Sequence, residues 1–163
     1  MQNRYFPRLD DDDDDEDEEE KSSSATRFLI EKLIGARVVM VTRAITDKLA
    51  EKIYAELSIL ENIDSNKRIT VIINSPGGHA DSGFGIYDML RFCRCPIRTV
   101  VAGMCASAAV PVFVAAKKGE RLSLPNSRFL LHQPSTKARG DASDIEITAQ
   151  EINKLKLKYN QIM

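Results

Sequence analysis

The stretch from Ile69 to Ser107 most constrains the fold, because it holds two short apolar runs separated by one helix-length segment. The first run, Ile69 to Ile73, is β-branched and ends in Asn-Ser-Pro-Gly-Gly, which is typical of a buried strand that closes in a tight turn. The second run, Arg98 to Ala102, leads into a series of small residues. We therefore predict a strand, a helix and a second strand, with Ser107 at the point where the second strand gives way to a helix.

The position of Ser107 is one that favours a nucleophile. A helix start offers unpaired N–H groups and the positive end of the helix dipole, which stabilise negative charge beside a reacting hydroxyl. A later apolar run, Arg128 to Pro134, contains His132 near its end. Ser107 and His132 are therefore a candidate nucleophile and base, although taken alone each is more often a helix cap or a hydrogen-bonded structural histidine.

The remaining segments predict further strands and helices around this stretch. A buried strand is expected over Arg37 to Thr42. A helix with Thr46 as its N-cap is expected to follow, because Leu49, Ile53, Leu57 and Leu60 recur at helical spacing. Shorter helices are expected over 26–34, 80–94 and 108–116, the last with Pro111 tolerated only in its first turn.

The last segment predicts a long amphipathic helix. Ser143 and Glu146 match a capping box, which would begin the helix there. Apolar residues then follow along one face at intervals of three or four, and an exposed apolar face of this kind favours burial by a partner. The residues of this face are Ile145, Ala149, Ile152, Leu155, Tyr159 and Ile162.

The charge of the chain is strongly asymmetric. Asp10 to Glu20 are eleven consecutive acidic residues, so the other 152 of the 163 residues carry 23 basic and 13 acidic groups despite a formal net charge of −1. Such a block repels itself and buries nothing. We predict an acidic tail or propeptide over residues 1–24 and one globular domain over residues 25–163.

Composition excludes several other classes of protein. No apolar run approaches the roughly 20 residues of a membrane span, and no signal-peptide core is present. Cys93, Cys95 and Cys105 lack metal-site spacing, so reduced thiols, no metal and a cytoplasmic location are expected. Basic residues are scattered without an aromatic-basic motif, so no nucleic-acid partner is predicted.

Five motifs in order resemble one known family. They are Ser75-Pro-Gly-Gly78, the Gly-x-x-Ala-Ser of Gly103 to Ser107, Leu124-Pro-Asn-Ser-Arg128, His132-Gln-Pro134 and Asp144-Ile-Glu146. In spacing they are similar to ClpP, the proteolytic subunit of the ATP-dependent Clp protease. The resemblance covers about residues 27–163. It implies an α/β fold of the ClpP/crotonase type, with stacked β-α-β units and a protruding handle helix.

The same resemblance implies a function and a site. The chain would be an ATP-dependent serine endopeptidase subunit that hydrolyses unfolded proteins inside a chamber of paired heptameric rings. Ser107 and His132 would be catalytic, and the amides of Gly78 and Ala108 would form the oxyanion hole. Substrate contacts are expected at Gly77, His79, Gln133 and Pro134. The handle helix would bring two rings together through Ile145, Ala149, Ile152, Leu155 and Tyr159.

The resemblance also implies partners and leaves alternatives open. An AAA+ unfoldase of the Clp family would use ATP, and no cofactor is expected in this chain, which has no G-x-x-x-x-G-K-[ST] motif. The family's third triad residue, an aspartate, has no counterpart at Asp88, Asp141 or Asp144, so low activity is expected of these 163 residues alone. A non-catalytic subunit of a mixed ClpP ring and a crotonase-like acyl-CoA enzyme are the alternatives.

Overall fold

The computed structural model describes residues 26–135 and 138–163, and the chain forms two compact units. The first unit ends at Ala36, and its described part, residues 26–36, is helical, which confirms the helix predicted there. The second unit runs from Arg37 to Met163. The predicted acidic tail lies outside the described residues.

The second unit is built on a parallel sheet. Its strands are β1 (Val38–Val41), β2 (Ile69–Ser75), β3 (Ile97–Ala106), β4 (Arg121–Ser123) and β5 (Arg128–Leu130). β1, β2 and β3 are neighbours in that order. β4 and β5 share the other edge of β3, with β4 on Thr99 to Val101 and β5 on Met104 to Ala106. The long strand β3 therefore pairs with two short strands, which lie one after the other along the same edge.

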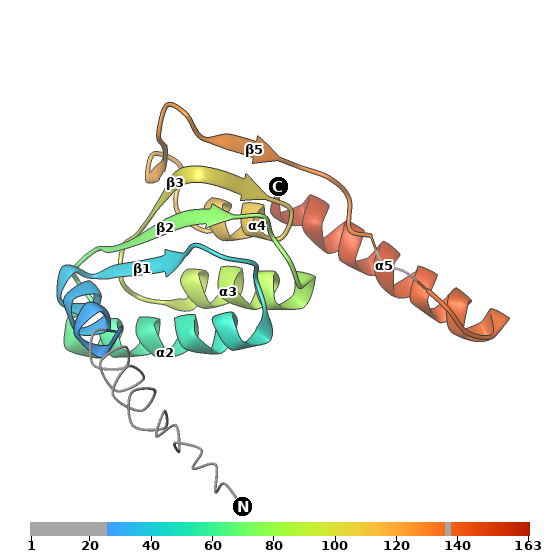
Figure 1. Cartoon of the computed structure of the whole chain (residues 1–163), viewed down its shortest axis with the longest axis horizontal. Coiled ribbons are helices and arrows are strands. Elements are labelled where there is room, and N and C mark those ends of the chain that lie inside the picture. The colour runs from blue at the N-terminus through green and yellow to red at the C-terminus, as the bar shows by residue number, and fades with distance from the viewer. Residues whose placement is uncertain (1–25, 136–137) are drawn as a thin grey trace, which may run out of the picture. The chain divides into compact units, whose positions relative to one another are not determined.

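Three helices lie along one side of this sheet (Figure 1), namely α2 (Asp47–Ile63), α3 (Ala80–Phe92) and α4 (Ala109–Val114). The predicted N-cap of α2 is confirmed, because the Thr46 hydroxyl accepts the Leu49 N–H at 3.2 Å. All four apolar residues predicted to face the sheet from α2 are buried. Pro111 is the third residue of α4, where its missing N–H breaks no hydrogen bond within the helix.

The last helix, α5 (Ala142–Ile162), extends away from the sheet and returns to α4 only near its C-terminal end (Figure 1). The capping box predicted at Ser143 is wrong. Asp141 occupies the N-cap position, which places Ser143 inside the first turn, and Asp141 makes no side-chain capping bond.

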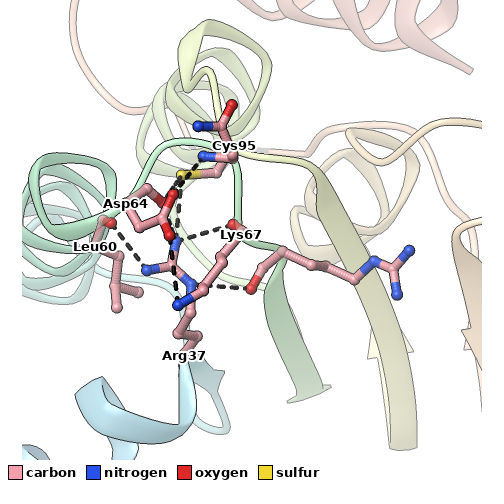
Figure 2. A network of polar contacts seen from close by, with 7 residues as sticks. Arg37, Leu60, Asp64, Lys67 and Cys95 are labelled. Carbon is pink, nitrogen blue, oxygen red and sulfur yellow. Dashed lines mark hydrogen bonds and ion pairs between the residues drawn. The ribbon is translucent and has the colours of Figure 1, made fainter.

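The Arg37 side chain connects the start of the sheet to the end of α2 through hydrogen bonds (Figure 2). Its guanidinium donates to the carbonyl oxygens of Leu60 at 3.1 Å, Asp64 at 2.9 Å, Lys67 at 3.0 Å and Arg68 at 3.1 Å. It also contacts the Cys95 sulfur at 3.4 Å. Leu60 and Asp64 lie at the C-terminal end of α2, and Lys67 and Arg68 directly precede β2, so the planar fork of five N–H donors joins the helix end to the start of that strand.

Arg37→Lys is expected to lower the free energy of unfolding by about 2 kcal/mol, because one ammonium cannot reach the carbonyls that the guanidinium joins. Urea unfolding followed by circular dichroism measures this change. Arg43→Lys is the matched control, since the Arg43 side chain is exposed. Equal midpoints for the two variants would show that the Arg37 network contributes nothing to stability.

Candidate active site

Ser107 sits in a strained turn between β3 and α4. Its φ of 53° is in the left-handed region, which costs a non-glycine residue about 1–2 kcal/mol and is often found at functional sites. Its N–H donates to the Leu130 carbonyl on β5 at 2.9 Å, and its own carbonyl accepts from Val110 at 2.9 Å. The main chain is thus fixed on both sides of Ser107, and the turn presents its side chain to a cavity.

The double glycine packs directly against this turn. Gly77 has φ of 87°, and a Cβ there would lie 2.7 Å from the Cβ of Ser107 and 2.6 Å from the Ala106 carbonyl oxygen. Gly78 has φ of 148°, and a Cβ there would overlap the Ile45 backbone. Neither position accepts a side chain, so the two glycines are needed for the backbone of this loop to pass beside Ser107.

The buried side chain of Ser75 holds the same loop. Its hydroxyl donates to the Arg43 carbonyl at 2.7 Å and accepts from the Gly77 N–H at 3.1 Å. Backbone bonds from Ile45 to Gly77 and from His79 to Ile45 attach the loop to the segment before α2. The position of Gly78 beside Ser107 is therefore set by two strands and the loop that follows β1.

His132 follows β5, and its tautomer can be deduced from one contact. Its Nδ1 lies 2.9 Å from the Gln133 carbonyl oxygen. A carbonyl can only accept, so Nδ1 carries the hydrogen, and in the neutral ring Nε2 has the lone pair. A general base needs that tautomer. Among the described residues, no carboxylate is bonded to this histidine, so the carbonyl holds the ring where a triad acid would act.

One cavity of about 480 Å³ brings most of the predicted site together. Ser107, His132, Gly78 and Ala108 all line it. Ala108 is the N-cap of α4, a position whose N–H has no acceptor inside the helix. The candidate nucleophile, the candidate base and the two residues predicted to supply the oxyanion donors therefore line the same cavity, as acyl transfer requires.

Of the residues predicted to contact substrate, His79 and Pro134 line the cavity with Ser107. Gly77 packs against the Ser107 turn, and the carbonyl of Gln133 contacts His132. Of the predicted handle face, Ile152, Leu155 and Tyr159 line this cavity, and Tyr159 is buried within the chain. Ile145 and Ala149 instead border a smaller hollow of about 310 Å³. Ile145 and Ala149 are exposed and Ile152 and Leu155 are half-buried, so Tyr159 is the member of the predicted face that the chain itself buries.

Cys105 is not a second nucleophile. It is fully buried two residues before Ser107, and burial raises the pKa of its thiol to about 12. Cys93 is also buried, and burial raises its thiol pKa to about 11. Because the thiolate is the reactive form, both thiols are inert near neutral pH.

Comparisons with known proteins identify the family of the chain. A family model described as Clp protease matches residues 20–163. The chain belongs to the Clp protease family. It is 40% identical over 135 residues to the ATP-dependent Clp protease proteolytic subunit 2 of Treponema denticola, a match that covers 83% of this chain and 68% of the relative. It is 42% identical to the corresponding subunit of Bacteroides fragilis, with 83% and 65% covered. The chain thus spans about two thirds of these relatives.

A solved structure agrees with this assignment. The ClpP1 N165D mutant from Listeria monocytogenes matches with a TM-score of 0.74 and 38% identity, over 82% of this chain and 74% of that one. The predicted α/β fold of the ClpP type is confirmed. The predicted class, a serine-type endopeptidase subunit of an ATP-dependent protease, is confirmed by the family and its relatives. These matches support the peptidase interpretation over the acyl-CoA alternative.

In this Clp family chain, sequence reasoning missed the residues that orient His79. Its Nδ1 lies 2.8 Å from Asp47 Oδ1 and 2.8 Å from the Ser82 hydroxyl, which itself donates to Asp47 in a very short bond. The bonds from Ser82 and then His79 lower the pKa of Asp47. Only the spacing of His79 and Ser82, one turn apart at the start of α3, hints at this cluster in the sequence.

Proposed function

We propose that Ser107 is the nucleophile and His132 the general base for hydrolysis of peptide bonds in unfolded polypeptides. The observation that carries this proposal is the strained turn of Ser107, which lines one cavity with His132, Gly78 and Ala108. Left-handed backbone at a non-glycine residue is costly, and here it presents a hydroxyl to the cavity that His132 also lines.

The reaction then proceeds in two steps. His132 Nε2 accepts the proton of the Ser107 hydroxyl while Oγ bonds to the substrate carbonyl carbon, and the Gly78 and Ala108 amides donate to the developing oxyanion. The C–N bond breaks as His132 returns the proton to the leaving amine. Water, deprotonated by His132, then releases the acyl group from Ser107 by the same route.

The substrate would bind as an extended strand. Gly77 and Gly78 on one side and the segment after His132, including Gln133 and Pro134, on the other offer backbone to such a peptide. Backbone pairing favours unfolded chains over folded ones and gives weak sequence selectivity.

Partners and location are part of the same proposal. Subunits would assemble as heptameric rings stacked in pairs, or as mixed rings with another ClpP chain, and an AAA+ Clp unfoldase would use ATP to feed them. Ile145 and Ala149 on the exposed first half of α5 would serve the contact between rings. A cytoplasmic location is proposed because the three cysteines are free thiols. No helix among the described residues is long and apolar enough to cross a membrane.

One observation favours a second candidate, a non-catalytic subunit of a mixed ring. Among the described residues, His132 is bonded to a carbonyl and to no carboxylate. A triad without its acid loses about four orders of magnitude in rate in the best-studied serine protease.

The deciding experiment is intact-protein mass after treatment with a fluorophosphonate probe. We expect one adduct on the assembled protein, lost in Ser107→Ala and kept in Ser135→Ala, because Ser135 lines the same cavity without the strained turn. An assembled protein that gains no adduct would establish the non-catalytic subunit instead.

A further inference from the structure

His79 lines the cavity that holds Ser107, and its two ring nitrogens differ in their contacts. Its Nδ1 is engaged by Asp47 and Ser82, and because the Asp47 carboxylate only accepts, Nδ1 carries the hydrogen. Nε2 of the neutral ring is then an acceptor. The ring comes from the turn before α3 and both of its partners come from helix starts, so its orientation is set by the fold.

A second acceptor lies beside this nitrogen. Asp81 Oδ2 is 3.9 Å from His79 Nε2, and both residues line the cavity. This separation exceeds a hydrogen bond, so the two acceptors do not satisfy each other. A single nitrogen donor placed about 2.8 Å from each would bond to both, because the N–H groups of an ammonium diverge at a suitable angle.

The fixed charge around this pair is negative. Asp81 lines the cavity and Asp47 lies behind the His79 ring, whereas the starts of α2 and α3 contribute only partial positive charge. One cation comes near, because Lys158 Nζ lies 4.6 Å from the centroid of the Phe84 ring, but Lys158 does not line the cavity. A cationic ligand is therefore favoured over an anionic one.

We propose that His79 and Asp81 form a subsite for a primary ammonium group of the substrate, either a lysine side chain or the free amino terminus of the peptide. The inference rests on the proposed function, because it takes the cavity beside Ser107 to be where the peptide binds. His79 and Asp81 are specificity-determining residues in this view, and neither takes part in bond making or breaking.

The test is a lysine scan. Internally quenched, N-acetylated peptides carry either lysine or norleucine at each position around the cleaved bond, so the pairs differ only in the ammonium group. At one position we expect kcat/KM to favour lysine by about fivefold, the upper range for an exposed ion pair. Asp81→Asn and His79→Leu are expected to bring that ratio close to one. Asp88→Asn, which removes a carboxylate further along α3 outside the cavity, is expected to leave it unchanged.

Two further arms complete the test. The norleucine peptides are measured with and without the N-terminal acetyl group, and a preference for the free amine that Asp81→Asn removes would assign the subsite to the peptide terminus. Binding of the same peptides to Ser107→Ala by fluorescence anisotropy tests the subsite without catalysis. A binding preference in Ser107→Ala, together with no hydrolysis of the same peptides by the unsubstituted protein, would refute Ser107 as nucleophile and leave the subsite standing. Hydrolysis or binding with no ammonium preference, or with a preference that Asp81→Asn keeps, would overturn the subsite.

Discussion

His132→Gln is expected to lower peptide hydrolysis by roughly 10⁶-fold, the cost of removing the triad histidine in a well-studied serine protease. The physical reason is that His132 is the proposed acceptor of the Ser107 proton, whereas Nε2 of His79, which also lines the cavity, lies 3.9 Å from the Asp81 carboxylate. Hydrolysis of a quenched peptide by the assembled protein measures the loss. His79→Gln in the same cavity is the comparison.

The losses of hydrolysis rate in His132→Gln and His79→Gln should differ by orders of magnitude. With a lysine-free, N-acetylated peptide, His79→Gln is expected to change the rate by less than about fivefold, because such a peptide offers no cation to His79 and Asp81. Similar losses in both variants would mean that the cavity, and not the base, had been damaged. Circular dichroism and the size of the assembly check that each variant is folded.

Gly77→Ala is expected to lower kcat/KM by at least about 100-fold, because the added methyl group would press on the Ser107 turn from 2.7 Å. A displacement of about 1 Å at a nucleophile is enough for a loss of this size. The left-handed φ of Gly77 adds a cost of about 1–2 kcal/mol to stability. Peptide hydrolysis and fluorophosphonate labelling measure the first effect, and urea unfolding measures the second.

Gly35→Ala is the matched control for this substitution. Gly35 lies in the helix of residues 26–36, and a Cβ there would meet nothing within 4 Å. The same change is therefore expected to leave hydrolysis intact and to favour the helix slightly. A Gly77→Ala protein that labels and hydrolyses like the starting protein would show that the tight packing against Ser107 has no part in catalysis.

Local signals predicted the part of the fold that depends on neighbours in sequence. The start of α2 followed from Thr46, and its buried face followed from the spacing of apolar residues. β3 is longer than predicted, since the apolar run ends at Ala102 but the strand continues to Ala106. Gly103 has a φ of 119°, which would normally end a strand. β3 continues beyond Gly103 because Met104 to Ala106 pair with β5. That pairing joins segments more than twenty residues apart, which no local pattern reveals.

The candidate site was predictable to the same degree. Ser107, His132, Gly78 and Ala108 stand in recognisable motifs, and the structure places them around one cavity. The cluster at His79 also includes Asp47, which lies at the start of α2. The sequence around Asp47 indicates only an interaction with the helix dipole. The orientation of His79 depends on how α2 and α3 pack together, and sequence periodicity carries no information about that contact.

The shared edge of β3 makes the spacing of the proposed nucleophile and base depend on the register of a three-residue strand. Ser107 donates to Leu130 on β5, and His132 follows only two residues later, so one strand edge sets the spacing of nucleophile and base. A slip of one residue would shift β5 by about 3.3 Å and turn its side chains to the opposite face. β1, β2 and β3 would stay paired throughout. The catalytic geometry therefore depends on the few backbone contacts between β5 and β3, separately from the pairing of β1, β2 and β3.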